Sequence, residues 1–450
     1  MSHTLLQKYN VPGPRYTSYP TVPFWKNSTL SELEWLDTIH LNYKTFGSNE
    51  ISLYIHLPFC ESLCTFCGCH KRITKNHAVE SPYIDAVIAE WKIYLSKLDF
   101  TPVIRELHLG GGTPTFFSPS ELKRLISSLV SMASVHPSAF EFSFEAHPNN
   151  TSDAHLEVLF GLGFKRLSLG IQDYSPTVQQ AIHRIQPFET VAKVHAKAKE
   201  VGYTSISHDL VFGLPKQTLS DIRDTVSKTL LLLPDRISLY SYAHVPWIKG
   251  VGQRGYDEND LPQDSEKRAL YEVAKSLLEE AGYLEVGMDH FALPHDSLAI
   301  AMKNKTLHRN FMGYTTQNTS MLLGLGMSSI SDSWFGFAQN EKTVEEYQKR
   351  VNRGELPVFR GHLLSPEELL IRRHILDLMC HFETVVNDKM FLEEVKVRLR
   401  EMEADGLVVF DGNKLLITEA GIPFVRNACM AFDKDLQGGE KREGMFSKTV

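Results

Sequence analysis

Four of the six cysteines in this 450-residue chain fall within ten consecutive residues, at Cys60, Cys64, Cys67 and Cys69. Disulfide frameworks belong to short secreted chains, so clustered thiols in a long chain indicate a metal or redox centre. The first three have the spacing C-x3-C-x2-C. Thiolates are the usual ligands of iron–sulfur clusters, and three of them leave one iron of a [4Fe–4S] cluster free to hold a small molecule. Zinc is the alternative, and it prefers four ligands, so Cys69 or His70 would have to complete the set.

Elements that could position this loop alternate regularly along the chain. Strand-like apolar runs occupy residues 51–58, 104–109, 140–146, 166–172, 205–213, 236–243 and 284–292. Amphipathic helical patterns lie between them at residues 82–98, 119–132, 190–201, 219–232 and 265–281. Such alternation predicts parallel strands joined by right-handed crossovers. We therefore expect an α/β fold, a full or partial (βα) barrel, with a doubly wound sheet as the alternative.

Polar residues interrupt the predicted strands at their carboxyl ends. The cysteine loop follows the first strand, a glycine triplet at 110–112 follows the second, and the next three strands carry Glu145, Gln172 and Asp209. In a (βα) barrel these ends meet at one mouth, where active sites lie. Glycines there allow the backbone to approach a ligand closely. For each single residue, an ordinary salt bridge at a strand end remains the alternative.

The C-terminal part has a different pattern. Two helical stretches, at 366–380 and 389–404, precede a hairpin at 406–417 whose turn is Asp411-Gly412-Asn413. This order predicts a small, mostly helical, winged-helix-like domain over 361–436. The predicted divisions are an N-terminal segment at 1–50, the barrel at 51–360, this domain, and a poorly ordered tail at 437–450.

The net charge of −7 disfavours a nucleic-acid partner. No apolar stretch approaches a membrane span, and no signal peptide is evident, so we expect a cytoplasmic protein.

The cysteine loop resembles the signature of the radical S-adenosylmethionine (SAM) superfamily. This resemblance implies that the free iron is chelated by the amino and carboxylate groups of SAM. An electron from the cluster then releases a 5′-deoxyadenosyl radical. It also implies that Phe66, between the last two cysteines, supports the adenine. The segment from Gly110 to Pro114 corresponds to the one that binds the SAM amino group.

Longer motifs resemble the oxygen-independent coproporphyrinogen III oxidases over nearly the whole chain. They are GPRYTSYP at 13–20, CGC at 67–69, YAHVP at 242–246, GMDHFA at 287–292 and LHRNFMGYTT at 307–316. That family converts two propionates of coproporphyrinogen III to vinyl groups in haem synthesis, using a radical from SAM. The resemblance implies a [4Fe–4S] cluster on Cys60, Cys64 and Cys67, two SAM molecules, and an electron donor and acceptor that the sequence does not identify. A haem chaperone of a related branch is the alternative, although those proteins generally lack the 13–20 and CGC motifs.

Site residues follow from the same resemblance, position by position. The cluster-bound SAM is expected to contact Tyr54, Gly111 and Glu145. The second SAM is expected to contact Phe66, Gly112, Thr113, Gln172, Arg184, Asp209, Ala243 and Ile330. The chain departs from the family pattern at His147, where an acidic residue is usual, and at Met312, where glutamine is usual.

The remaining expectations concern the substrate. Cys69 is predicted to act in turnover rather than as a cluster ligand, because a fourth ligand would block the SAM site. The N-terminal segment, with Arg15, Tyr16 and Tyr19, is predicted to cover the substrate. Coproporphyrinogen III carries four propionates, so we expect cations in its pocket, with Arg309 as the anchor and His290 and His308 nearby. We expect the protein to be a monomer.

Overall fold

The computed structural model describes residues 3–26, 30–245, 252–437 and 445–449. Its central feature is a run of neighbouring parallel strands in the order β9-β8-β7-β6-β4-β1. Their bounds are β1 (Glu50–Leu57), β4 (Val103–Gly111), β6 (Glu141–Ala146), β7 (Phe164–Gln172), β8 (Ser205–Phe212) and β9 (Arg236–Ser241). The parallel order confirms the predicted βα alternation.

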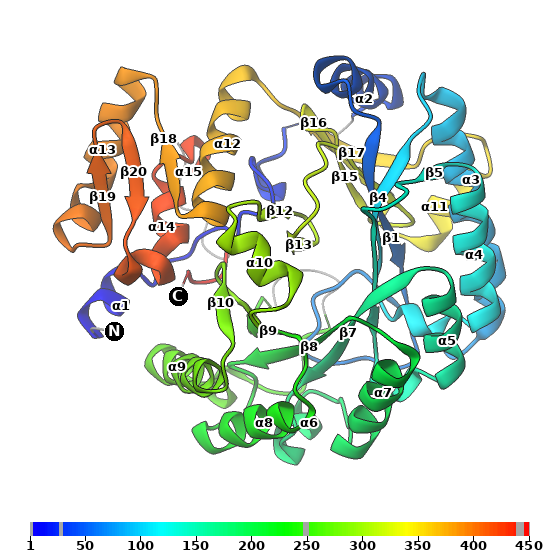
Figure 1. The fold of residues 1–450 in the computed structure, drawn as a ribbon, viewed down its shortest axis with the longest axis horizontal. Coiled ribbons are helices and arrows are strands. Elements are labelled where there is room, and N and C mark those ends of the chain that lie inside the picture. The colour runs from blue at the N-terminus through cyan, green and yellow to red at the C-terminus, as the bar shows by residue number, and fades with distance from the viewer. Residues whose placement is uncertain (1–2, 27–29, 246–251, 438–444, 450) are drawn as a thin grey trace.

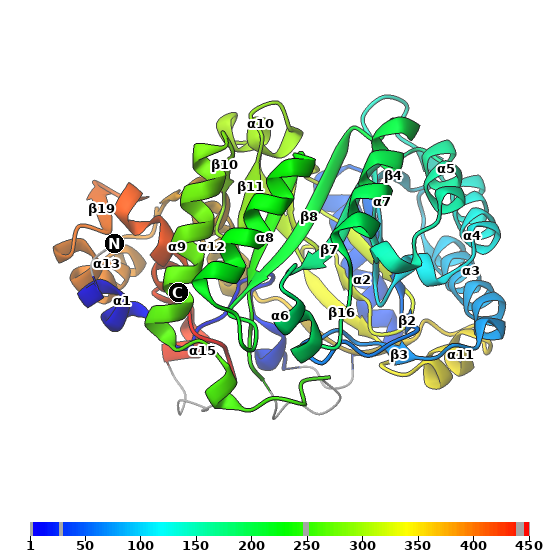
Figure 2. The same ribbon diagram turned by 90° about the horizontal axis from the view of Figure 1, so that it is seen from below.

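Helices cover the outer face of this curved sheet (Figures 1 and 2). They are α3 (Glu80–Lys97), α4 (Pro119–Ser131), α5 (Asp153–Gly161), α7 (Phe188–Val201), α8 (Leu219–Leu232) and α9 (Asp264–Glu280). Buried apolar side chains such as Trp91, Leu125 and Ile222 belong to the same core as the strand residues Leu53, Leu107 and Ile206. Because these strands run parallel, their carboxyl ends lie at one edge of the sheet, and the loops that follow them lie on one side.

The sheet stays open, so the barrel is the partial one of the two expected forms. Beyond β1 it continues through β14 (Leu322–Leu325), β15 (Ile330–Asp332), β16 (Gly336–Asn340) and β17 (Val358–Leu363). Beyond β9 it continues through β11 (His290–Ala292) to β10 (Leu284–Val286). Among the described strands of these extensions, only β14 runs parallel to the neighbouring strand nearer the centre of the sheet, which is β1. On the other side, β11 pairs antiparallel with β9.

The prediction of one strand at 284–292 was therefore wrong. The segment is an antiparallel hairpin in which Val286 pairs with His290. The chain reverses at Gly287, whose φ of 66° suits glycine, and a Cβ there would overlap the Tyr314 ring. Apolar periodicity alone does not distinguish two short strands and a tight turn from one longer strand.

The C-terminal domain has the predicted winged-helix-like order. Helices α12 (Pro366–His381), α13 (Lys389–Ala404) and α14 (Val425–Met430) pack around a small sheet in the order β18-β20-β19. Its strands are β18 (Glu383–Val385), β19 (Val408–Asp411) and β20 (Lys414–Ile417), and Gly412 turns the hairpin with a φ of 63°. A separate apolar core, including Leu378, Val395 and Phe432, holds this domain together.

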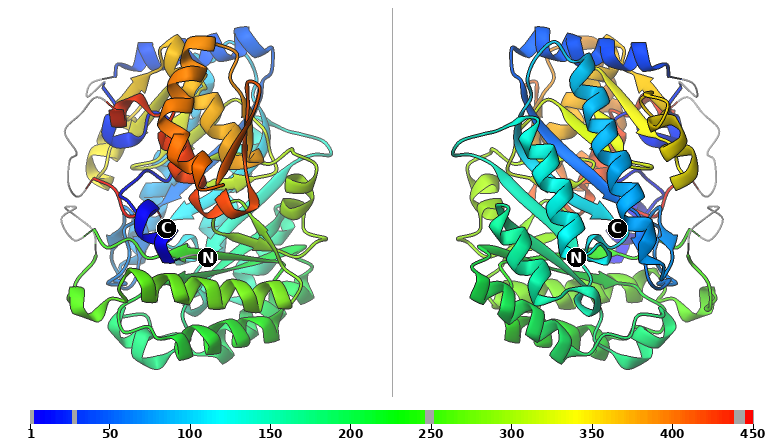
Figure 3. Two further views of the ribbon diagram at one scale, coloured as in Figure 1. Left: turned by 90° about the vertical axis from the view of Figure 1, so that its left-hand side faces the viewer. Right: turned by 90° about the vertical axis from the view of Figure 1, so that its right-hand side faces the viewer.

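The two ends of the chain lie side by side against this domain (Figures 1 and 3). Helix α1 (His3–Tyr9) leads into a segment whose Tyr9, Tyr16 and Tyr19 are buried in the C-terminal core. Of the predicted tail at 437–450, residues 438–444 and 450 lie outside the part of the chain that the structure describes. Its residues 445–449 are not a loose tail, because the Gly13 N–H donates to the Ser447 carbonyl at 3.0 Å and Pro12 forms a β-bridge with Lys448.

The remaining helices and strands are shorter than those of the barrel, except for α2, which lies on the outer side of the sheet. They are α2 (Glu32–Phe46), α6 (Pro176–Ala181), α10 (Ser297–Lys303), α11 (Val344–Val351), α15 (Lys434–Gln437), β2 (Phe59–Cys60), β3 (Arg72–Ile73), β5 (Ser134–Val135), β12 (His308–Asn310) and β13 (Gly313–Thr315). Within the described parts of the chain, no helix combines the length and apolar character that a membrane crossing requires.

Candidate active site at the mouth of the barrel

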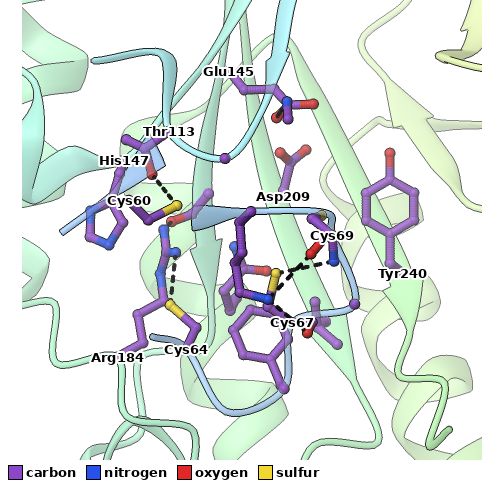
Figure 4. A pocket seen from close by; sticks show the side chains of 18 of the residues that line it. Cys60, Cys64, Cys67, Cys69, Thr113, Glu145, His147, Arg184, Asp209 and Tyr240 are labelled. Carbon is purple, nitrogen blue, oxygen red and sulfur yellow. Dashed lines mark hydrogen bonds between the residues drawn. The ribbon is translucent and has the colours of Figure 1, made fainter. Parts of the chain in front are cut away.

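A cavity of about 490 Å³ opens at the carboxyl ends of the parallel strands. The side chains that line it come from segments far apart in sequence (Figure 4). Its predicted members are Cys60, Cys64, Phe66, Cys67, Cys69, Gly111, Gly112, Thr113, Glu145, Gln172, Arg184, Asp209 and Ala243. The structure therefore brings together most of the residues that the sequence singled out. Pro246, which ends the motif containing Ala243, lies outside the described residues.

The cysteine loop is held at both of its ends. Behind it, the Arg72 N–H donates to the Pro58 carbonyl at 2.8 Å, and the Thr74 N–H donates to the Cys60 carbonyl at 2.9 Å. On the opposite side, the Thr65 N–H donates to the Ile182 carbonyl at 2.9 Å. These bonds keep the backbone fixed while the thiol groups face the cavity.

The thiols differ in their readiness to ionise. A hydrogen bond from the Cys69 side chain and the charge of Lys71 lower the pKa of Cys67 below its usual value, although burial opposes them. Burial raises the pKa of Cys60 to about 11, and its hydrogen bond with the Thr113 hydroxyl at 3.3 Å only partly offsets this. Because a metal binds the thiolate, iron would have to displace the Cys60 proton. Three cysteines on one loop facing one cavity suit a [4Fe–4S] cluster.

The glycine turn after β4 fits directly against the cysteine loop. The Gly112 N–H donates to the Leu57 carbonyl at 2.8 Å, and the Thr113 N–H donates to the Phe59 carbonyl at 3.0 Å. A Cβ on Gly112 would lie 2.5 Å from the Pro58 carbonyl oxygen. Gly111 has a φ of 112°. Glycine is required here because the two loops approach more closely than any side chain allows.

Two carboxylates face the cavity from neighbouring parts of the sheet. The Gly111 N–H donates to Glu145 at 3.3 Å, and the His108 ring lies 3.6 Å from the same carboxylate. Burial raises the pKa of Asp209 to about 6, while hydrogen bonds from Ser168 and Ser238 act in the opposite direction. Both groups can attract a cation, such as the sulfonium or ammonium of SAM.

Two polar atoms on neighbouring side chains, Arg184 Nε and Gln186 Oε1, are buried without a hydrogen-bond partner in the described structure. Arg184 itself donates to the Gly170 carbonyl at 2.5 Å and lies 3.7 Å from the Cys64 sulfur. Unpaired buried donors and acceptors are costly, so this wall is suited to a polar ligand. SAM, with its amino acid, ribose and adenine groups, has the required donors and acceptors.

Other predicted residues lie outside the described lining of this cavity. Tyr54 lies behind it, where its hydroxyl bonds to His56 at 3.1 Å, and Ile330 lies on β15. His290 lines a smaller adjoining cavity of about 100 Å³ together with Asp209. His308 lines a separate cavity beside α12. Arg309 is only 4% exposed, and its guanidinium lies over the Tyr314 ring.

Sequence reasoning missed Lys71 and Tyr240, which both line the cavity. Tyr240 lies two residues after Ser238 on β9, so alternation of the strand places both on one face. That signal was available once Asp209 had been placed on the neighbouring strand. Lys71 donates to the Cys67 and Cys69 carbonyls at 3.2 and 3.3 Å, a contact that its sequence position does not reveal.

The partial barrel and the three-cysteine loop at its mouth define a radical SAM protein. The family model of the radical SAM superfamily matches residues 54–229. Its members use a [4Fe–4S] cluster and SAM, and these are the cofactors of this chain.

Full-length relatives identify the family more narrowly. The oxygen-independent coproporphyrinogen III oxidase of Helicobacter pylori strain J99 is 38% identical, covering 98% of this chain and 98% of the relative. Its counterpart in Pseudomonas aeruginosa is 36% identical, covering 99% of this chain and 98% of the relative. The solved coproporphyrinogen III oxidase of Escherichia coli, described as a radical SAM enzyme, matches with a TM-score of 0.88 at 33% identity, covering 97% of this chain and 99% of that one. The chain belongs to the family of oxygen-independent coproporphyrinogen III oxidases.

Proposed function

We propose that this protein converts two propionate side chains of coproporphyrinogen III to vinyl groups, giving protoporphyrinogen IX without oxygen. The observation that carries the proposal is the joint placement of the three-cysteine loop, the glycine turn and the two carboxylates around one cavity. Full-length similarity to oxidases of this name supports the choice of substrate over other radical SAM reactions. When bound, the reduced cluster and SAM supply the 5′-deoxyadenosyl radical that removes hydrogen from a propionate.

Each group of residues has a proposed role in this reaction. Cys60, Cys64 and Cys67 hold the cluster. Tyr54, Gly111 and Glu145 belong to the site of the cluster-bound SAM. Phe66, Gly112, Thr113, Gln172, Arg184, Asp209, Ala243 and Ile330 belong to a second SAM site. The supporting geometry is strongest for those that line the cavity, whereas Tyr54 supports the first site from behind, through His56.

The partners of the reaction follow from its chemistry. Loss of carbon dioxide from a propionate radical leaves one electron, so the protein needs an electron donor for the cluster and an acceptor for the product. We propose that both are separate molecules and that the protein acts as a monomer. A thiolate-bound cluster is compatible with a reducing compartment, so we place the reaction in the cytoplasm.

An anaerobic assay tests the proposal. The cluster-reconstituted protein, given SAM, a reductant and coproporphyrinogen III, is expected to form vinyl products and 5′-deoxyadenosine together. Replacing Cys60, Cys64 or Cys67 with alanine should abolish both products and the brown cluster absorption. A protein that binds iron, SAM and coproporphyrinogen but forms neither product would contradict the proposal.

The haem-chaperone alternative has a different signature. A chaperone would retain haem stably and pass it to an acceptor, without consuming coproporphyrinogen. The motifs at 13–20 and 67–69 and the oxidase names of the full-length relatives favour the enzyme. Haem titration of the same preparation distinguishes the two functions.

A further inference from the structure

The cations that line the cavity make different contacts. Among the described residues that line it, the lysines and arginines are Arg15, Lys71 and Arg184. Lys71 bonds to carbonyls of the cysteine loop, and Arg184 lies against the Cys64 sulfur. Both are therefore committed to the cluster side. Arg15 enters from the N-terminal segment and contacts the last residue of β9 instead of the cysteine loop.

Arg15 has donors left over for a ligand. One guanidinium nitrogen donates to the Ser241 carbonyl at 2.9 Å, and another lies 4.0 Å from Asp289. That carboxylate already accepts a closer hydrogen bond from His290 at 2.6 Å. The Arg15 side chain is 33% exposed, so its remaining N–H groups are accessible from the cavity.

Two buried arginines hold the backbone of Arg15 in place. Arg309 donates to the Arg15 carbonyl at 3.3 Å, and Arg426 donates to the Pro14 carbonyl at 2.8 Å. Arg309 is too deeply buried to reach the cavity itself. The earlier expectation that Arg309 binds a propionate therefore changes, because its observed contacts make it a positioning residue for Arg15.

The surroundings of Arg15 also carry an excess of positive charge. The Lys267 ammonium donates to the Tyr242 carbonyl at 2.7 Å. Burial lowers the pKa of Lys267 to about 8, and the charges of Arg15 and Arg426 add to this effect. Arg426 bonds to backbone carbonyls rather than to a carboxylate. The Asp289 carboxylate offsets part of this charge, and an incoming anion would relieve the repulsion that remains among these three cations.

We propose that Arg15 binds a propionate carboxylate of the porphyrinogen, and so sets how the substrate lies between the N-terminal segment and the cluster. A planar guanidinium can grip a carboxylate with two charge-assisted hydrogen bonds. The proposal rests on the proposed function, because it names the anchor for that substrate. Lys71 and Arg184 remain in contact with the cysteine loop.

Equilibrium binding tests the proposal without relying on turnover. The probe is coproporphyrin III, which is fluorescent and carries the same four propionates, and its tetra-amide serves as the uncharged match. Arg15→Met in the full-length, cluster-reconstituted protein should raise the dissociation constant of coproporphyrin III about 10- to 100-fold. Arg15→Lys should give an intermediate value, because it keeps the charge and loses the fork. The tetra-amide should bind wild type and Arg15→Met alike.

Arg268→Met is the matched control. Arg268 lines a neighbouring small cavity with Arg15, but it is paired with Glu272 on its own helix. The Arg268→Met variant should leave the dissociation constants of coproporphyrin III and of its tetra-amide unchanged within about twofold. The affinity for SAM should be unchanged in every variant. Equal binding of coproporphyrin III to wild type and Arg15→Met, or an equal loss in Arg268→Met, overturns the proposal. If the wild-type protein consumes coproporphyrinogen, either of these two results leaves the proposed function standing. If the wild-type protein neither binds coproporphyrin III nor consumes coproporphyrinogen, both the role of Arg15 and the proposed function fail.

Discussion

Cys69 differs from the three cysteines before it in its position and its contacts. It is exposed at the cavity, and its N–H donates to the Cys67 sulfur at 3.4 Å. A backbone donor of this kind stabilises a thiolate whether or not the Cys69 side chain is present. The Cys69 side chain also helps to lower the pKa of Cys67, but the backbone donor remains when that side chain is removed, so we expect the cluster to persist without the Cys69 thiol.

We expect Cys69→Ala to keep the cluster absorption, iron content and SAM affinity while losing at least about tenfold in vinyl formation, consistent with a role in substrate handling or electron return. Cys67→Ala, two residues away, should instead lose the cluster itself. Absorption spectra, iron analysis and product assays on the two variants separate these outcomes. Wild-type turnover in Cys69→Ala would show that this thiol has no part in the reaction.

Asp209 gives the cavity a pH-dependent charge. Its pKa is raised to about 6 by burial, so the carboxylate is charged at pH 7.5 and becomes neutral as the pH falls through 6. If it attracts SAM, the dissociation constant of SAM should increase below pH 6, by up to about tenfold for each pH unit.

The Asp209→Asn variant is the control for that titration. It should bind SAM more weakly at pH 7.5, and its affinity should change little between pH 7.5 and 5. Anaerobic calorimetric titration of the two proteins measures both trends. Parallel pH profiles for wild type and Asp209→Asn would assign the pH dependence to another group.

The sequence predicted single residues best where their roles depend on local spacing. The three cysteines lie on one loop because seven residues of chain cannot separate them far. The contacts of Arg309 depend instead on Arg15, which is 294 positions away in the sequence. No local pattern shows that one arginine lies beneath the other, so a sequence prediction selected the buried one.

At the scale of elements, two turns must fit together before the site exists. The turn after β4 packs on the loop after β1, because β1 pairs with β4 without a register shift from Ser52 to Leu57. Gly112 lies where they touch. Its missing side chain allows both the Leu57 hydrogen bond and the close approach to Pro58.

Gly112→Ala is therefore expected to push the glycine turn away from the cysteine loop. The Cβ would meet backbone atoms, which cannot move aside as a flexible side chain can. We expect SAM affinity to fall by at least about tenfold, together with reduced cluster retention and a free energy of unfolding lowered by about 1–3 kcal/mol. Calorimetry with SAM, iron analysis and denaturant unfolding check these three effects.

Gly161→Ala provides the comparison. Gly161 ends α5, and a Cβ there would meet no atom within 4 Å. It should be neutral or slightly stabilising, because alanine is the better helix former. A Gly112→Ala protein that behaves like Gly161→Ala would show that the two turns can separate without cost.

The sequence predicted whole elements well where apolar periodicity is long, as in α8 and α13, whose bounds match the predicted ranges. Short strands gave weaker signals. The extension of the sheet through β14, β15 and β16 was missed, because each has only three to five residues and is almost fully buried. A buried strand this short lacks the alternation that identifies a half-exposed one.

At the scale of the molecule, the first part of the N-terminal segment, as far as Tyr19, belongs structurally to the C-terminal domain. Tyr9, Tyr16 and Tyr19 lie in its core, although more than 340 residues separate them from α12. Deleting residues before Pro23 would thus expose that core as well as remove Arg15. Such a truncation cannot test substrate covering alone, and point variants are needed.

Tyr16 joins the two ends of the chain most directly. Its buried hydroxyl donates to Asp433 at 2.9 Å. Burial raises the pKa of Asp433 to about 6, and this hydrogen bond partly counteracts the rise. In wild type the folded state therefore retains a proton that the unfolded chain has lost. The contribution of Asp433 to stability decreases as the pH rises from about 4 to 6 and is constant above that range.

Tyr16→Phe keeps the ring in the core and removes only this donor. At pH 7.5 the Asp433 carboxylate is charged and loses a charge-assisted hydrogen bond, so the free energy of unfolding should fall by about 1–3 kcal/mol. At pH 5 most of the carboxyl is neutral, and the loss should be smaller. Thermal unfolding of the full-length holoprotein at the two pH values measures the difference, and hydrogen exchange should localise it to residues 366–437.

Tyr43→Phe is the control, because its ring stacks on Phe100 at 4.4 Å and retains that contact. A Tyr16→Phe deficit that is equal at both pH values would show that the hydroxyl stabilises the junction of the two ends by packing rather than through the charge of Asp433.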